Sequence, residues 1–138
     1  MSGQQTAAAR TPQAGRRPVR RTTALGARGE SLAADFLARV GLRIIDRNVR
    51  VPGGELDLVA ADGDDVVFVE VKTRVGDAQS APDEAVTPAK LARIERLAAA
   101  YLDARGQTDN AWRIDVVAVV VDPRGKVLRI EHLKGAFL

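Results

Sequence analysis

Three charged side chains on two neighbouring stretches of this sequence have the types and the spacing to do chemistry together. Asp57 lies in the stretch Glu55–Ala60, and Glu70 and Lys72 lie in the stretch Val66–Lys72. Carboxylate oxygens bind hard divalent cations, and an ammonium group beside them can stabilise charge on an attacking water or on a phosphate. This combination is typical of metal-dependent cleavage of a phosphodiester.

Glu70 and Lys72 are expected on one face of a β-strand, because the residues around them alternate in character. The alternate valines would point to one side of a sheet, while Phe68, Glu70 and Lys72 would point to the other. A lone carboxylate on such an apolar strand is costly unless it is paired or binds a metal. Each acid taken alone is explained as an exposed strand residue or one half of an ion pair, whereas the three charged residues together favour a site.

The stretch before this strand is predicted to pair with it as a hairpin. Residues Ala61–Asp65 (ADGDD) are typical of a turn that reverses the chain. Alternation predicts that one face of the first strand carries Leu56, Leu58 and Ala60. The opposite face is predicted to carry Glu55, Asp57 and Val59. Asp57 would then lie across the hairpin from Glu70.

The composition favours one compact domain that can hold a metal only through oxygen. The chain has 138 residues, of which 46% are hydrophobic, and this is enough for a core. It has no cysteine, which excludes a disulfide framework and a thiolate metal site. With His132 as its one histidine, a histidine-based zinc site is not expected either.

The positive charge is concentrated at the N-terminus. The net charge is +3, but residues 1–29 contain six arginines and no acid, which leaves residues 30–138 at −3. Residues 1–22 have few large apolar side chains, so we expect a disordered basic tail before a folded domain over residues 23–138. Its candidates for contact with nucleic acid are Arg16, Arg17, Arg20 and Arg21. The same tail is explained as well by an extension that has no function.

No segment is expected to enter a membrane. No run approaches the roughly 20 apolar residues of a membrane-spanning helix. The N-terminal segment has basic residues but lacks the apolar stretch of a secretory signal. We therefore expect a soluble, cytoplasmic protein.

Helical spacing of apolar residues predicts two amphipathic helices. The first covers about residues 23–40 and is ended by Gly41. The second begins with Thr87 as its N-cap and Pro88 at its first position, and it ends before Gly106.

Further strands are predicted at residues 42–51, 112–121 and 127–133. The run 112–121 is apolar nearly throughout, which favours a central strand covered on both faces. The last strand is expected at an edge of the sheet, with Arg129, Glu131 and His132 exposed. Together with the hairpin, this order predicts an α/β fold, an αβββαβ(β) sandwich with a mixed central sheet.

Two charged residues on the predicted helices are candidates for the same site. Glu30 falls at the border of the apolar stripe of the first helix, where it either faces a cleft or is a solvated surface residue. Lys90 lies on the stripe of the second helix, where it either contacts a phosphate at the mouth of the site or is a surface lysine of the first turn.

The ordered set of these residues resembles an uncharacterised bacterial family of predicted endonucleases related to archaeal Holliday junction resolvases. The resemblance covers about residues 25–138. Its residues are Glu30 in a helix, G-E-L-D at Gly54–Asp57, F-V-E-V-K-T-R at Phe68–Arg74, Lys90 in a helix, and R-I-D-V-V at Arg113–Val117.

The resemblance implies the restriction-endonuclease-like fold of the PD-(D/E)xK superfamily, and with it a nuclease-like domain over residues 23–138. Asp57, Glu70 and Lys72 stand at its motif positions, and Glu30 matches the first-helix acid of the resolvases. Leu56 stands where the superfamily motif has proline. Asp57 and Glu70 would bind Mg²⁺ or Mn²⁺ together with the main-chain carbonyl of Val71. Glu30 would bind a second ion or order a water.

Two hypotheses follow for the function. The first is a metal-dependent DNA endonuclease that acts on branched or otherwise structured DNA, with Arg74, Lys90 and the tail along the DNA backbone. Resolvase-like chemistry on two strands would favour a homodimer. The second is a catalytically silent module on the same fold that binds nucleic acid or a protein partner.

Overall fold

The computed structural model of the protein describes residues 24–77 and 86–136. The tail predicted to be disordered, residues 1–22, lies outside these ranges, as does much of the loop before the second helix. Within them, two helices and five strands follow one another in the predicted order. They are α1 (Ala24–Arg39), β1 (Arg43–Val51), β2 (Gly54–Asp62), β3 (Asp65–Val75), α2 (Pro88–Ala104), β4 (Trp112–Val121) and β5 (Val127–Leu133).

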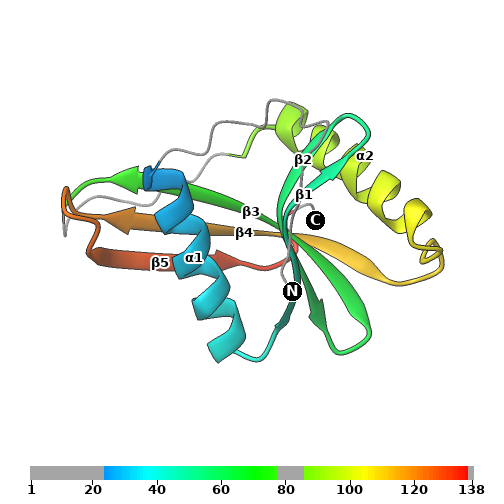
Figure 1. The fold of residues 1–138 in the computed structure, drawn as a ribbon, viewed down its shortest axis with the longest axis horizontal. Coiled ribbons are helices and arrows are strands. Elements are labelled where there is room, and N and C mark those ends of the chain that lie inside the picture. Colours follow the sequence, from blue (N-terminus) through cyan, green and yellow to red (C-terminus); the bar gives the residue numbers. More distant parts are fainter. Residues whose placement is uncertain (1–23, 78–85, 137–138) are drawn as a thin grey trace, which may run out of the picture.

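The five strands form one mixed sheet in the order β1-β2-β3-β4-β5 (Figure 1). The pairs β1–β2, β2–β3 and β4–β5 are antiparallel, and the pair β3–β4 is parallel. A parallel pair needs a crossover connection, and α2 supplies it between β3 and β4. The predicted α/β sandwich with a mixed sheet is therefore confirmed.

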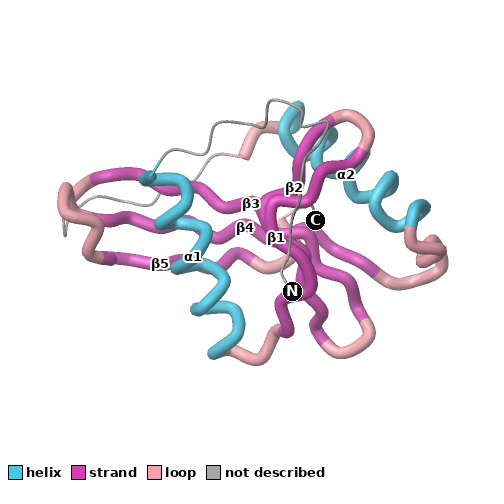
Figure 2. Tube along the Cα trace, viewed as in Figure 1, coloured by secondary structure: helices cyan, strands magenta, loops and turns pink. Residues whose placement is uncertain are grey.

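The two helices cover opposite faces of the sheet (Figure 2). Ala33 and Leu37 of α1 pack in a cluster with side chains of β2, β3 and β4, such as Val119. Ile94 and Leu97 of α2 pack in the second cluster. β4 is buried along nearly its whole length because each face of it meets one of these clusters, as expected for its apolar sequence.

Aromatic contacts anchor α2 to the sheet. The rings of Tyr101 and Trp112 both lie edge-on to Phe68, with centroid distances of 5.6 and 5.9 Å. The Tyr101 hydroxyl donates a hydrogen bond of 2.9 Å to Asp46 of β1. Burial and this hydrogen bond raise the pKa of the Tyr101 phenol above its ordinary value.

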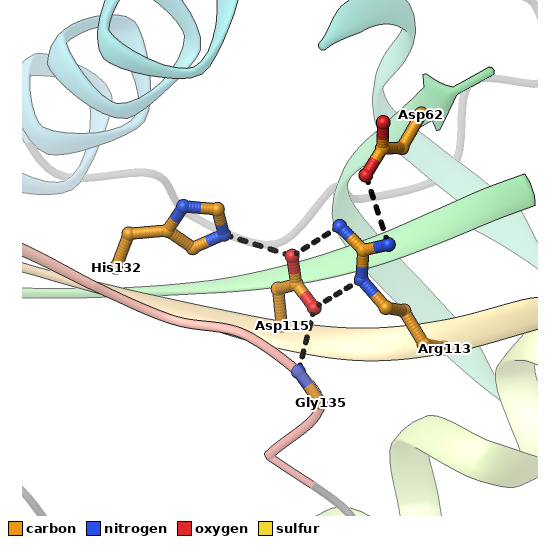
Figure 3. A network of polar contacts seen from close by, with 5 residues as sticks. All are labelled: Asp62, Arg113, Asp115, His132 and Gly135. Atoms are coloured by element: carbon orange, nitrogen blue, oxygen red, sulfur yellow. Dashed lines mark hydrogen bonds and ion pairs between the residues drawn. The ribbon is translucent and has the colours of Figure 1, made fainter. Parts of the chain in front are cut away.

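A buried carboxylate, that of Asp115, ties β4 to the end of the chain (Figure 3). The Asp115 side chain accepts hydrogen bonds of 2.9 Å from Arg113 Nε, 2.8 Å from His132 Nε2 and 3.0 Å from the amide of Gly135. The same guanidinium reaches Asp62 of β2 at 3.0 Å. One fully buried acid thus links elements that are far apart in the sequence.

The environment of Asp115 favours its charged form. Burial by itself raises the pKa of this carboxyl, but the hydrogen bonds from Arg113, Gly135 and His132 and the charge of the guanidinium outweigh it and hold the pKa below its ordinary value. A buried acid is tolerable in a protein when its oxygens are satisfied in this way.

His132 was expected to be exposed, and this expectation is wrong. Its side chain is only 9% exposed, because the ring contacts Asp115 and lies perpendicular to the Phe36 ring. Arg129 and Glu131 on the same strand are exposed as predicted. The alternation of apolar and polar residues in β5 is weak, so the sequence did not indicate that His132 points inward to the buried Asp115.

We expect the stability of the protein to fall in acid through Asp115. Because its pKa is depressed in the fold, its stabilisation is complete above the unfolded-state pKa of about 3.9 and is lost as the pH falls from there through the folded pKa. Asp115→Asn should cost about 3–5 kcal/mol at neutral pH because it leaves Arg113 without its buried partner. In the Asp115→Asn variant, the free energy of unfolding, measured by urea denaturation, should also fall less steeply as the pH is lowered.

Asp35→Asn is the matched control, because Asp35 is exposed on α1. It should leave both the stability and its pH dependence close to those of the unchanged protein. If Asp35→Asn made this fall less steep by as much as Asp115→Asn does, net charge rather than the buried network would be responsible.

The close approach of α1 to β3 depends on a glycine. A Cβ placed on Gly29 would lie 2.7 Å from Thr73 Cβ and closer still to the Thr73 hydroxyl. Real Cβ atoms do not approach side-chain atoms so closely, so a larger residue would push the helix off the strand that carries Glu70 and Lys72.

Gly29→Ala should therefore destabilise the protein, by about 1–3 kcal/mol in urea denaturation. In an unhindered helix the same change would stabilise by about 0.5–1 kcal/mol. The sign of the change in stability therefore shows whether the contact with Thr73 is as tight as in the structure. Thr73→Ala should return part of the loss in the double variant, because it removes the hydroxyl and leaves only the Cβ contact. Additive effects of the two changes would contradict this interpretation.

Candidate active site

The site lies where β2 separates from β3. The two strands pair as far as Leu58 with Val69, and the residues of β2 before Leu58 pair only with β1. At the same point the side-chain alternation of β2 breaks, since Leu56 packs under α2 while Leu58 packs under α1. The predicted common face for Leu56, Leu58 and Ala60 is therefore wrong at Leu56. The regular alternation of the strand is therefore interrupted at Asp57, so that Leu56 can pack against α2 and Leu58 against α1.

Asp57 occupies this break and bonds to the neighbouring strand through its side chain. Its Oδ2 accepts a hydrogen bond of 2.9 Å from the main-chain N–H of Val71. In a continuous antiparallel pair a main-chain carbonyl of β2 would serve as acceptor for such a group. The carboxylate thus satisfies a strand donor at the fork and is held in place by it.

A cavity of about 370 Å³ opens at this fork. It is bounded by β2, β3 and the first turns of α2. Its lining residues are Glu55, Asp57, Glu70, Val71, Lys72, Lys90 and Arg93. The structure therefore brings Asp57, Glu70 and Lys72 to one cavity, together with the main chain at Val71.

Glu70 and Lys90 form an ion pair inside the cavity. Their charged groups lie 3.2 Å apart, and the Glu70 side chain is only 14% exposed. Lys90 is positioned by the start of α2, where the Thr87 hydroxyl accepts a hydrogen bond from the Lys90 amide and Pro88 follows the cap. The predicted helix start therefore determines which lysine reaches the acid.

Glu30 does not line the cavity, although it lies close to the same fork. Its Oε1 accepts a hydrogen bond of 2.9 Å from Nδ2 of Asn48 on β1. Asn48 has a positive φ of 49° and lies next to the pair formed by Val49 and Leu56. A left-handed asparagine on β1 thus links the helix acid to the part of the sheet where β2 changes face.

Of the other residues predicted to contact nucleic acid, only Arg74 is described by the structure. Arg74 is exposed on β3, two residues beyond Lys72, and does not line the cavity. Arg16, Arg17, Arg20 and Arg21 lie outside the described residues.

Two residues of the cavity were not predicted as part of a site. Glu55 belongs to the G-E-L-D motif and was expected on the same strand face as Asp57, but it was given no role in the site; it is half-buried and lines the cavity. Arg93 follows Lys90 by three positions on α2, and residues at this spacing share a helix face. Its spacing from Lys90 could therefore have indicated that Arg93 faces the same cavity.

Among residues 24–77 and 86–136, no three acidic or histidine side chains gather closely enough to hold a metal ion by themselves. The cavity offers the carboxylates of Asp57, Glu70 and Glu55 over a wider space, with Lys72, Lys90 and Arg93 beside them. Acids and bases are thus equal in number at this cavity.

The order of elements and the forked sheet define the protein as an α/β sandwich of the restriction-endonuclease-like kind. Comparison with known proteins shows that the chain belongs to the uncharacterised protein family UPF0102, whose model matches residues 29–119. This range contains every residue of the cavity.

Relatives share about half of their residues with this chain. The chain is 48% identical to the UPF0102 protein of Moorella thermoacetica over 109 residues, which are 79% of this chain and 91% of the relative. It is 50% identical to that of Beutenbergia cavernae over 117 residues, or 85% and 98%. The protein of Geobacter sulfurreducens is 49% identical over 114 residues, or 82% and 88%.

Neither described helix combines the length and the apolar character that crossing a bilayer requires.

The hydrogen bond from Val71 makes a prediction about Asp57 that does not depend on activity. Asp57→Ala should cost about 1–3 kcal/mol in urea denaturation, because the Val71 N–H loses its acceptor where β2 no longer supplies one. Asp57→Asn keeps an acceptor oxygen and should lose much less. Amide hydrogen exchange at Val71 should accelerate in the alanine variant only. Equal losses in both variants would mean that the charge of Asp57, and not its hydrogen bond, supports the fork.

Proposed function

We propose that the protein is a metal-dependent DNA endonuclease that uses Mg²⁺ or Mn²⁺. The observation that supports this most is the meeting of Asp57, Glu70 and Lys72 at one cavity, from two strands that part at that point. Two carboxylates and an ammonium at a concave site are the groups that hydrolysis of a phosphodiester requires.

The donors at the cavity fit a small, hard cation. Mg²⁺ in phosphate-handling sites is held by one or two carboxylates together with oxygens of the substrate. Asp57 and Glu70 supply the carboxylates, and the main-chain carbonyl of Val71 is the third donor that we propose. When bound, the cation supplies a Lewis acid that lowers the pKa of water and offsets charge on the phosphate.

Asp57 enters this role in a fixed position. Its hydrogen bond to the Val71 amide orients the carboxylate and leaves it little conformational freedom to lose when a ligand binds. Lys72 would stabilise negative charge that grows on the phosphate and would help to orient the attacking water. Arg74, exposed just beyond it, would contact the DNA backbone.

Lys90 has a double role in this proposal. In the absence of a divalent ion its ammonium neutralises Glu70 at 3.2 Å. When Glu70 turns to a cation, Lys90 would be released toward a phosphate at the mouth of the cavity. Glu30, bonded to Asn48 beside the fork, would bind a second ion or order a water.

The substrate that we propose is branched or otherwise structured DNA. Cutting two strands of a junction symmetrically requires two sites related by a twofold axis, and a homodimer would supply them.

One observation favours a second function, a catalytically silent module that binds nucleic acid or a protein partner. Glu70 already has a cation, Lys90, and the described residues contain no tight group of three acids. A site retained for its charge pattern alone would look the same. The two functions separate on whether a divalent ion supports turnover.

Cleavage assays separate these functions directly. We expect the purified protein to cut at least one of fork, flap, four-way-junction and linear DNA in Mg²⁺ or Mn²⁺, and none in chelator. Glu70→Gln and Lys72→Ala should each lower the cleavage rate by about 100-fold or more, because each removes a group that acts mainly in the transition state. DNA binding, measured in chelator, should survive in both variants.

Glu131→Gln and Lys134→Ala are the matched controls, since both residues are exposed and neither lines the cavity. They should cut as the unchanged protein does. If Glu70→Gln melts at a higher temperature and cuts no less, Glu70 is a buried charge that costs stability without serving catalysis, and the binding module is the better proposal.

A further inference from the structure

A second and larger cavity, of about 660 Å³, lies at the far end of the sheet from the β2–β3 turn. It is bounded by the first turn of α1, the end of β3 and the turn between β4 and β5, which Figure 1 shows side by side. Three cationic residues line it: Arg28, Arg124 and Lys126. Asp122 is the one acidic residue among its lining, so the cavity carries a net charge of +2.

The turn that carries two of these cations is held in shape by its own hydrogen bonds. The Asp122 carboxylate accepts bonds of 2.9 Å from the amides of Arg124 and Lys126. Arg28 Nε donates to the carbonyl of Gly125 at 2.9 Å, which connects the turn to α1. Asp122 therefore binds main chain, and within residues 24–77 and 86–136 neither Arg124 nor Lys126 has an ion-pair partner for its side chain.

This arrangement keeps positive charge at a concave surface, with Arg124 and Lys126 exposed to solvent. A cleft lined mainly by charges of one sign attracts ions of the opposite sign. An anion with several negative charges would therefore be attracted here. Arginine and lysine side chains around a cavity are the groups that contact phosphate oxygens.

β3 connects this cavity to the candidate active site. Lys72 lines the site and Val75 lines the cavity, three positions further along the same strand. At about 3.3 Å per residue the two positions are about 10 Å apart. Residues three apart on a strand point to opposite faces of the sheet, so Lys72 faces α2 while this cavity lies beside α1, and DNA that reaches both must pass around the end of β3. Exposed Arg74 lies between the two positions.

The N-terminal segment joins the described structure at the same cavity. Ala24, its first described residue, is part of the lining. The 23 residues before it contain five arginines and no acid. The most basic part of the sequence is therefore attached at a cavity that is itself basic.

We propose that this cavity, defined by Arg28, Arg124 and Lys126, binds the phosphate backbone of the DNA that flanks the cleavage site. The inference deepens the proposed function by giving the DNA a path over the carboxyl end of β3 toward the β4–β5 turn. It assigns the β4–β5 turn a role in binding and none in the chemical step.

The test compares the salt dependence of DNA binding in two double variants of the full chain. Arg124→Gln with Lys126→Gln removes two charges from the cavity and leaves Arg28 in its bond to Gly125. Arg39→Gln with Arg43→Gln removes two charges from exposed positions near the other end of α1. Binding to a fluorescein-labelled duplex is followed by anisotropy between about 50 and 200 mM salt, in chelator so that no DNA is cut.

The cavity variant should lower the slope of log K against log salt by about 2, because each lost phosphate contact accounts for nearly one unit. Its Kd at low salt should rise about tenfold. The control variant should keep the slope of the unchanged protein. Equal slopes for the two variants, or no binding of DNA by the unchanged protein, would overturn the inference.

A competition arm separates a nucleic-acid backbone from a small anion. Inorganic phosphate, added at constant ionic strength, should not displace the duplex, because a single phosphate lacks the spaced charges of a backbone. If phosphate binds at the cavity while the slope of the cavity variant is unchanged, the cavity holds a free small anion and the proposed DNA path is wrong.

The outcome is distinguishable from failure of the proposed function. Binding is measured in chelator, so a protein that cuts no DNA can still show the expected change in slope. Conversely, cleavage that depends on Glu70, combined with an unchanged slope for the cavity variant, would leave the endonuclease proposal standing and remove only the role of the β4–β5 turn.

Discussion

The candidate site depends on one hydrogen bond, in which the Asp57 carboxylate accepts the amide of Val71. A sheet that stayed paired past Leu58 would bring β2 and β3 together and leave no space between them. Where β2 leaves β3, the Asp57 carboxylate replaces a main-chain carbonyl as acceptor for the Val71 N–H, so the sheet can fork without leaving this amide unpaired. The same bond aims an acid at the space that the fork creates. Stability and the candidate chemistry therefore meet at one residue.

The two faces of the sheet handle charge in different ways. On the α1 side, Asp115 is fully buried, and its oxygens accept hydrogen bonds from Arg113, His132 and Gly135. These bonds leave its charge a structural role. On the α2 side, Glu70 keeps some exposure and pairs with Lys90, whose side chain is 38% exposed. A lysine on a flexible stem is easier to displace than a buried guanidinium with a forked contact. Only the second arrangement leaves room for a ligand.

Much of the fold could be predicted because its elements follow local rules. Thr87 and Pro88 start α2 by capping, and the apolar run of β4 requires cover on both faces. The alternation around Glu70 indicated which way its side chain points. The face of Leu56 and the burial of His132 could not be predicted, because each depends on a contact with a distant element. A break in the pleat leaves no trace in a period-two pattern.

The sequence by itself determined the order of helices and strands and the three charged residues that could act together, since capping, turn chemistry and side-chain alternation operate over a few residues. Tertiary structure alone decided that β2 forks from β3 at Asp57, that Lys90 neutralises Glu70, and that Glu30 bonds to Asn48 rather than lining the cavity. It also gathered Arg28 and Lys126, which are nearly a hundred residues apart, around one space. These outcomes follow from how the helices pack across the sheet. Packing between segments that are distant in the sequence cannot be predicted from local residue patterns.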